Sequence, residues 1–341
     1  MRIIHAAAIA AFLLAPAASA QAPAAAASEP SRVLDTAVVT GVVPGPGLWK
    51  VRHGENTMWI LGTQSPLPAK MEWEAAKVRG AIARSDAALA PPSVSVGGDV
   101  GFFGRLALIP AALKLRNNPD GKPLRDSVEP AAYARWVPLR QRYFGNDRGI
   151  EKRRPIIAAT ELYERAMKRS GLTGPKRVYD EIERAMKKRK LKWTNSVAEF
   201  KVPNIRGAVK ELQRTRLEDG NCFERTLDRL ETDVGYMRMR ANAWANGDVE
   251  ALRRLQRPDQ YEACRDALLK SALASKYGIE GAEAQSKQKW LANADAALRK
   301  NRGTFAVLPM RELLTSDGLL AKLQARGFVV EPPSRPVATA P

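Results

Sequence analysis

The sequence predicts an α/β fold: a central mixed β-sheet flanked by helices, with a long helical insertion. Three observations support this class. Two short apolar runs near residue 50 flank a polar turn, as in a β-hairpin. A strand–helix–strand pattern ends the folded part, and most apolar residues between these two regions recur at helical spacing. With 341 residues and 45% hydrophobic content, the chain can bury one large core or two ordinary ones.

The first twenty residues have the features of a secretory signal peptide. Arg2 is a short basic start, Ile3 to Ala15 form a small apolar segment, and Ala18-Ser19-Ala20 is a small-x-small cleavage pattern. An uncleaved membrane anchor would need about 20 apolar residues, and this run stops at Pro16. The protein is therefore expected to be exported, and to be periplasmic or secreted after cleavage near Ala20.

Composition sets the expected boundaries of the folded part. Residues 21–45 are rich in Ala and Pro and are expected to be a flexible linker. Residues 332–341 contain four prolines and are expected to be a disordered tail. A single domain is expected over 46–331. No other apolar run is long enough for a transmembrane segment.

The first elements follow in order along the chain. The hairpin turns at His53–Asn56, and its second strand ends at a Gly-Thr turn. Apolar residues at i, i+4 in an Ala-, Glu- and Lys-rich stretch predict a helix over Glu72–Arg84. Ala87–Ala90 is a short buried strand that two prolines stop, and Val96–Asp99 is a Gly-rich loop.

Helices are predicted for the middle of the chain. Pro155–Thr160 is either a strand or the start of the helix Glu161–Ser170, and we favour the helix, which ends before Gly171. From Phe223 to Trp244 apolar residues alternate at spacings of four and three, which predicts one long helix with one apolar stripe. Gly247 ends that helix, and Asp248 can cap the next one. We favour a packed helical hairpin over a partner-binding coiled coil, since the heptads are short.

The C-terminal part predicts a compact β-α-β unit. Thr304–Leu308 is a buried strand, and Ser316-Asp317-Gly318 opens a helix that carries three leucines. Gly327 closes this helix, and Phe328–Glu331 is the last strand.

Short motifs in two of these places resemble the TraB/GumN family, which includes PrgY-related proteins and the Tiki-like metalloproteases. The motifs are Gly62-Thr63-Gln64-Ser65, after the first hairpin, and Trp244-Ala245-Asn246-Gly247-Asp248. The family pattern at the first place is Gly-Thr-x-His, in which the His is a presumed metal ligand. The resemblance implies the fold and an ancestral metal-dependent hydrolase or protease activity.

The chain departs from the family pattern at each position that carries chemistry. Ser65 stands where the family has its first His. Near the end of the chain the family has Gly-x-x-His, and this chain has Pro309-Met310-Arg311-Glu312. Pro91 takes the place of a strand-end carboxylate. Ser286 and Lys287 take the places of an Arg-Asn pair before Trp290. The chain thus resembles a degenerate member that lacks both motif histidines.

The number of histidines also argues against a metal site, and this argument does not depend on the family resemblance. His5 leaves with the signal peptide, so the mature chain keeps His53 alone, in the predicted hairpin turn. A metal site with two or three imidazoles is then impossible within one subunit. His53 is more simply a solvated turn residue than a catalytic base. We expect a catalytically inactive relative, a pseudoenzyme with a binding or structural role and no cofactor.

An active enzyme remains the alternative. Strand ends in open α/β sheets meet at one crevice, and a pocket could be lined there by the degenerate motif positions Gly62, Thr63, Ser65, Pro309, Arg311 and Glu312. Carboxylates alone could hold a divalent metal, for which the less favoured candidates are Glu312, Asp317 and Glu161.

The strong positive charge suggests a different function. The formal charge is +19, or +18 without Arg2, and such a surface attracts anionic partners. Anionic lipid or polysaccharide is the expected partner class. Sequence-specific nucleic-acid binding is not expected, because no recognised binding motif is present. A solvated basic surface without a partner is an equal alternative. The predicted basic patch comprises Lys152, Arg153, Arg154, Arg184, Lys187, Lys188, Arg189, Lys190 and Lys192.

Cys222 and Cys264 are the only cysteines. An even count in an exported chain predicts a disulfide. It would close a loop of about 40 residues and stabilise the fold by about 4 kcal/mol. Two buried free thiols are the alternative.

Overall fold

The computed structural model describes residues 37–98, 102–256, 264–265 and 272–333. The predicted signal peptide, residues 21–36 of the predicted linker, Asp99 of the predicted loop and residues 334–341 of the predicted tail lie outside the described residues.

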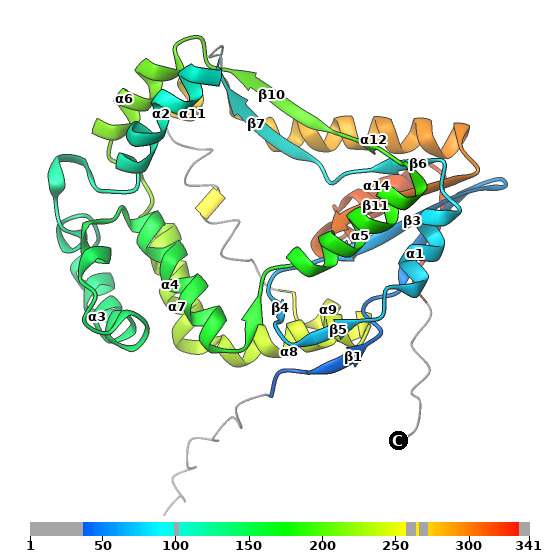
Figure 1. Ribbon diagram of the computed structural model, residues 1–341, viewed down its shortest axis with the longest axis horizontal. Helices are drawn as coiled ribbons and strands as arrows, with labels where there is room; N and C mark the ends of the chain where they lie inside the picture. Colours follow the sequence, from blue (N-terminus) through cyan, green and yellow to red (C-terminus); the bar gives the residue numbers. More distant parts are fainter. Residues whose placement is uncertain (1–36, 99–101, 257–263, 266–271, 334–341) are drawn as a thin grey trace, which may run out of the picture. The chain divides into compact units, whose positions relative to one another are not determined.

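A six-stranded mixed sheet forms the centre of the fold, in the order β12-β2-β3-β11-β6-β9 (Figure 1). The pairs β12–β2 and β2–β3 are antiparallel, whereas β3–β11, β11–β6 and β6–β9 are parallel. The predicted fold class is confirmed. The strands are β2 (Leu48–His53), β3 (Asn56–Thr63), β6 (Ala87–Leu89), β9 (Trp193–Thr194), β11 (Gly303–Pro309) and β12 (Val329–Glu331).

The apolar sequence of β11 explains its central place. Phe305, Val307 and Leu308 are all fully buried, as expected for a parallel strand that is covered on both faces. Helix α12 lies across β2, β3, β11 and β6, while α1 contacts β11 and packs against α5. Two-stranded ladders lie outside this sheet: β1 (Gly41–Val43) with β5 (Met71–Trp73), β4 (Leu67–Pro68) with β8 (Leu172–Thr173), and β7 (Ser93–Gly97) with β10 (Val197–Lys201).

The predicted helical insertion lies between β6 and β11, which are neighbours in the sheet although most of the chain separates them. Its helices α3, α4 and α7 build a second hydrophobic core around Trp136, Leu162 and Phe223. The described helices are α1 (Ala76–Ala83), α2 (Phe102–Lys114), η1 (Pro119–Gly121), η2 (Leu124–Asp126), α3 (Pro130–Phe144), η3 (Gly149–Lys152), α4 (Pro155–Arg169), α5 (Lys176–Arg189), α6 (Ile205–Arg214), α7 (Gly220–Thr232), α8 (Val234–Ala245), α9 (Val249–Arg254), α11 (Ala272–Lys276), α12 (Ala282–Lys300), α13 (Met310–Leu314) and α14 (Leu319–Ala325).

Several local predictions are confirmed. The hairpin, the strand after Arg84, the helix from Pro155 and the last strand form where they were expected. Asp248 caps α9, because its Oδ1 accepts a hydrogen bond from the Ala251 N–H at 2.8 Å. None of the helices in the described ranges combines the length and the apolar character needed to cross a bilayer.

Two predictions near the N-terminus were wrong. The helix expected from Glu72 begins only at Ala76, because Met71–Trp73 pair with Gly41–Val43 as a parallel ladder. That pairing also shortens the expected linker, since Val43 is buried and the Gly45 N–H donates to the Ala245 carbonyl at 2.8 Å. The chain is therefore ordered from before residue 45.

The loop expected at Val96–Asp99 is in part a strand. Ser93–Gly97 form β7, which pairs in parallel with β10, about a hundred residues further along the chain. Residues 93–96 alternate Ser and Val, a pattern that is too short to form a stable strand without a pairing partner. A distant partner therefore decides their structure.

The long helix expected from Phe223 to Trp244 is two helices. Asp233 has φ −119° and ψ 10°, and it separates α7 from α8. The apolar stripe is real, but it serves two cores: Phe223 and Leu227 pack in the second core, whereas Trp244 packs in the core of the sheet. The change of core falls within α8, since Met237 and Ala241 still pack in the second core.

The predicted disulfide joins Cys222 to Cys264, with an S–S distance of 2.01 Å. Cys222 is fully buried in α7. The bond therefore anchors residues 264–265 to the second core.

We expect the variant Cys222→Ala/Cys264→Ala to lose about 4 kcal/mol of unfolding free energy, because the bond closes a loop of 42 residues and restricts the unfolded chain. Urea unfolding of this variant and of the oxidised wild type measures the loss. Equal midpoints for the two proteins would contradict a stabilising bond.

Candidate functional site

The two degenerate motifs lie side by side at one edge of the sheet. Strands β3 and β11 are parallel and in register, so that Thr63 is paired with Pro309 and Gly62 with Leu308. Strand β6, on the other side of β11, ends just before Pro91. The structure therefore brings together the strand-end positions that the sequence assigned to one crevice, as the parallel order of these strands requires.

The first motif is packed from several sides. A Cβ on Gly62 would lie 2.6 Å from Cε of Met310, so a larger residue would displace the end of the Met310 side chain. The Trp244 Nε1–H donates to the Gly62 carbonyl at 2.9 Å, and Thr63 is only 6% exposed. Ser65, which the resemblance puts at the position of a motif His, is exposed.

The second motif is held by an ion-pair network. Helix α13 begins directly after β11 and carries Glu312, which is 4% exposed. The Lys287 Nζ lies 2.8 Å from Glu312 Oε1, and the Leu319 N–H donates to Glu312 Oε2 at 3.2 Å. Both carboxylate oxygens thus have donors, and one of these donors is the first N–H of α14.

A second carboxylate completes this network. Glu283 Oε1 lies 3.0 Å from Lys287 Nζ and 3.0 Å from Arg311 Nη2, and its Oε2 lies 3.0 Å from Arg265 Nη1. We call Arg265, Glu283, Lys287, Arg311 and Glu312 the strand-end network. Three cations and two carboxylates leave it with a net positive charge.

Lys287 is the centre of the strand-end network. Burial of its ammonium opposes the charged form, but hydrogen bonds to Glu312 and Glu283 outweigh burial and raise the pKa of Lys287 above its ordinary value. Lys287 therefore keeps its positive charge throughout the neutral range, and it loses this charge only as the pH rises through that raised value.

The side chains at the strand ends are poor ligands for a divalent metal ion. Ser65 offers a neutral hydroxyl, and both oxygens of Glu312 are engaged by Lys287 and Leu319. A metal would have to displace an ammonium from a buried carboxylate. Within the described ranges, no group of three or more His, Cys, Asp and Glu side chains is arranged to hold a metal ion.

The other residues considered for chemistry lie elsewhere. Glu161, on α4, pairs with Arg116 at 2.6 Å, and so belongs to the helical insertion and not to the crevice. Asp317 is exposed, and a hydrogen bond from Thr315 lowers its pKa. His53 is the last residue of β2, and its ring contacts the Phe328 ring edge-on at 5.6 Å.

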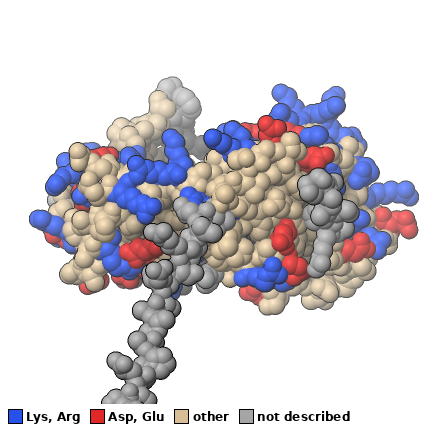
Figure 2. Space-filling view, turned by 90° about the horizontal axis from the view of Figure 1, so that it is seen from below, with Lys and Arg blue, Asp and Glu red and all other residues tan. Residues whose placement is uncertain are grey.

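The predicted basic patch is not a single surface. Arg154 is 3% exposed, so it does not belong to a surface. Lys152 and Arg153 adjoin α4 in the insertion, whereas the cations from Arg184 onward lie on and after α5, which packs on α1. Figure 2 shows Lys and Arg in several separate groups on the face that it displays.

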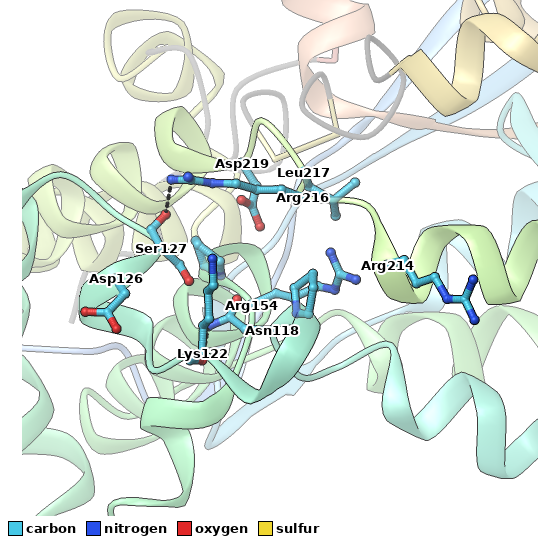
Figure 3. Close-up of a pocket in the computed structure, with 11 residues that line it drawn as sticks. Asn118, Lys122, Asp126, Ser127, Arg154, Arg214, Arg216, Leu217 and Asp219 are labelled. Atoms are coloured by element: carbon cyan, nitrogen blue, oxygen red, sulfur yellow. Dashed lines mark hydrogen bonds between the residues drawn. The ribbon is translucent and has the colours of Figure 1, made fainter.

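Arg154 instead forms the wall of a small cavity of about 110 Å³ (Figure 3). Its guanidinium donates to the carbonyls of Leu115 at 2.9 Å, Thr215 at 2.8 Å and Leu212 at 2.6 Å. Two of these carbonyls lie at the C-terminal end of α6, where helix carbonyls lack partners. Burial lowers the pKa of Arg154, although the Asp219 carboxylate opposes this effect. Arg154 is thus a structural cation.

Asp219 is the buried anion of the same cavity. Its Oδ2 accepts a hydrogen bond from the Ile156 N–H at 2.9 Å, in the first turn of α4. Burial raises the pKa of Asp219, while this hydrogen bond and the nearby arginines oppose the rise. Figure 3 shows Arg216 reaching Ser127, whose carbonyl it contacts at 3.2 Å, and Arg214 extending away from the other labelled residues.

We expect ionised Asp219 to cost stability. Its folded pKa lies above the ordinary value of 3.8, so the native state binds the proton more tightly than the unfolded state does. Wild-type stability should therefore fall, relative to Asp219→Asn, as the pH rises from about 4 to about 7. Urea unfolding across this range measures the difference. The control Asp126→Asn removes an exposed carboxylate of the same cavity, and a similar pH trend in that control would contradict the assignment.

These features together define an α/β protein with a strand-end site and a large helical insertion. The chain belongs to the TraB/PrgY/gumN family, whose sequence profile matches residues 47–332. No curated protein and no solved structure matches the chain significantly.

The sequence indicated the strand-end positions but not the side chains that form ion pairs there. Lys287 was singled out only as a replaced motif residue, and Glu283 and Arg265 were not considered. The spacing of Glu283 and Lys287 at i, i+4 was a visible signal for an ion pair on α12. No local pattern could have placed Lys287 against Glu312.

Proposed function

We propose that this chain is an exported member of the TraB/PrgY/gumN family that has lost metal-dependent hydrolysis and keeps a binding or structural role. The observation that carries the proposal is the engagement of both Glu312 oxygens, by Lys287 and by the start of α14. A catalytic metal needs several free ligands and an open position for water or substrate. The strand-end network supplies neither at Glu312, and Ser65 replaces an imidazole by a hydroxyl.

In this proposal Glu312 stabilises the fold through its ion pair and its hydrogen bond. Its carboxylate connects α13, the first turn of α14 and α12, three elements around the end of β11. The Glu312 carboxylate is 4% exposed, and leaving it unpaired would cost stability. In a family member that binds no metal, Lys287 and the Leu319 N–H therefore take the place of a metal as its partners.

A calorimetric titration of the mature protein with Zn²⁺ and Mn²⁺ tests the proposal. We expect no stoichiometric binding above the level that Glu312→Gln shows. Tight binding of one ion per chain that Glu312→Gln abolishes would overturn it. That result would support the alternative, an active metal-dependent hydrolase that uses carboxylates at the same crevice.

Export is part of the proposal. The apolar N-terminal segment and the small-x-small pattern before Gln21 support it, as does a disulfide, which persists in oxidising compartments. Intact-mass measurement of protein from the exported fraction should give a chain that begins at or near Gln21. A retained Met1 in that fraction would contradict cleavage.

A second candidate function is binding of an anionic lipid or polysaccharide. The cations at the end of α5 favour it: Lys187, Lys188, Lys190 and Lys192 are exposed, and none has an acidic partner among the described residues. Such binding should weaken with salt. Binding to an acidic polymer that stays unchanged in high salt would contradict an electrostatic role for this α5 cluster.

A further inference from the structure

Helix α2 is apolar on all sides, yet the protein covers only one of them. Its sequence has no charged residue between Arg105 and Lys114. Leu108 and Ala111 are half-buried, and the Gln213 Nε2 donates to the Ala111 carbonyl at 2.8 Å, which attaches α2 to α6. On the other side Leu106, Ile109 and Leu113 are 54%, 50% and 56% exposed.

Such a helix is unusual in a protein surrounded by water. A helix that is hydrophobic all round is normally buried in a core or in a membrane. The 13 residues of α2 extend about 20 Å, which is too short to span a bilayer but sufficient to lie in its surface. The exposed leucines and isoleucine recur at i, i+3 and i+7, so they form one stripe along the helix. This apolar stripe needs a partner.

Helix α6, which packs beside α2 (Figure 1), supplies charge of one sign. Arg206, Lys210 and Arg214 stand at i, i+4 and i+8 and are all exposed, and none forms an ion pair within the part of the chain that the structure describes. The one acidic residue of α6, Glu211, is already paired with Lys276 at 2.7 Å. Figure 3 shows Arg214 directed away from the cavity residues.

We propose that α2 and α6 form a docking surface for an anionic lipid bilayer. Leu106, Ile109 and Leu113 insert among the acyl chains, while Arg206, Lys210 and Arg214 lie at the level of the lipid phosphates. An apolar stripe beside a row of cations is the combination that holds a helix in a membrane interface.

Charge and polarity distinguish this occupant from others. A polysaccharide would engage the cations but would leave the apolar stripe in water. A second copy of the chain would cover the stripe, but a symmetric contact would bring two rows of cations close to each other, which is unfavourable. The inference takes up the binding role of the proposed function, but it needs neither the α5 cluster nor the strand-end network.

Vesicle co-sedimentation of the full mature protein tests the proposal. The probes are vesicles of neutral phosphatidylcholine, with and without about one third phosphatidylglycerol. We expect binding to the anionic vesicles only. The variant Leu106→Ser/Ile109→Ser/Leu113→Ser should bind more than tenfold more weakly, and so should Arg206→Gln/Lys210→Gln/Arg214→Gln. All substituted side chains are exposed, so circular dichroism should show an unchanged fold.

A matched control removes the same number of charges from the α5 cluster. The variant Lys187→Gln/Lys188→Gln/Lys190→Gln should change vesicle affinity by less than about threefold. An affinity loss in this variant with none in the α2 variant would support the second candidate function and overturn the α2–α6 surface. Failure of the wild type to bind anionic vesicles would overturn the α2–α6 surface. Self-association in sedimentation experiments that the α2 variant abolishes, without vesicle binding, would assign the stripe to a second copy.

A fluorescent label gives a readout that does not depend on affinity. Both native cysteines are in the disulfide, so Ile109→Cys can be labelled selectively with an environment-sensitive dye. Its emission should shift to the blue when anionic vesicles are added, whereas a label at Lys190→Cys should not respond. The opposite pattern, with the α5 label in the apolar phase, would contradict the proposed orientation.

Discussion

The variant Lys287→Met is expected to lose about 3 to 5 kcal/mol of unfolding free energy. Glu312 is 4% exposed and would lose the ammonium that lies 2.8 Å away. Removing one partner of a buried ion pair is costly, because the desolvation of the remaining group is no longer compensated by an opposite charge. Glu283 would lose one of its three cations as well. Urea unfolding at neutral pH measures the loss.

A double-mutant cycle separates this pair from general damage to α12. Glu312→Gln alone keeps the shape and removes the charge, and in the background of Glu312→Gln the change Lys287→Met should cost much less. We expect a coupling free energy of about 2 kcal/mol or more. Lys289→Met, which removes an exposed cation two residues along the same helix, should cost under about 1 kcal/mol. Additive effects of the two substitutions would show that Glu312 does not depend on Lys287.

Arg154→Met should be comparably destabilising, by about 3 to 5 kcal/mol. Arg154 is 3% exposed, and its guanidinium donates to carbonyls from two segments, at the end of α6 and after α2. Methionine fills similar volume but donates nothing, so these buried carbonyls would lose their partners, at a cost of about 1 to 3 kcal/mol each where water cannot enter. Asp219 would also lose its nearest buried cation.

Lys152→Met is the matched control, since it removes the same charge two residues earlier at an exposed position. We expect its effect to stay within about 0.5 kcal/mol. Thermal and urea unfolding of both variants give the comparison. A loss in Lys152→Met equal to that in Arg154→Met would mean that net charge, and not the buried hydrogen bonds, is responsible.

Local patterns predicted the elements that depend on local interactions. The hairpin around Gly54 and the apolar strand Gly303–Pro309 follow from residue spacing and turn chemistry, and both form as expected. That the ends of β3 and β11 lie side by side also followed from the α/β pattern, because the carboxyl ends of parallel strands meet at one edge of a sheet. The sequence thus predicted which strand ends lie together.

Interactions between distant segments decided the rest. Strand β7 exists because β10 pairs with it, and Met71–Trp73 leave the predicted helix because β1 pairs with them. The long apolar stripe of α7 and α8 could not reveal that it faces two cores. Likewise, the state of Glu312 depends on Lys287, which reaches it from a different helix. Single-sequence patterns carry no information on such contacts.

Which basic residues share a surface could be decided only from the structure. Consecutive basic residues suggested one patch, but Arg154 lies in the interior and the α5 cluster belongs to another part of the fold. The cations Arg206, Lys210 and Arg214 do not form a basic run in the sequence, since they are four residues apart. Their significance comes from the apolar helix that packs beside them.

The metal content of the native protein, purified without chelators, tests the central claim most directly. Lys287 already occupies the carboxylate that a metal at this sheet edge would require. Elemental analysis by mass spectrometry should therefore find no zinc, manganese, iron or other divalent transition metal at more than about a tenth of an equivalent per chain. One equivalent of such a metal in the wild type, lost in Glu312→Gln, would contradict the account.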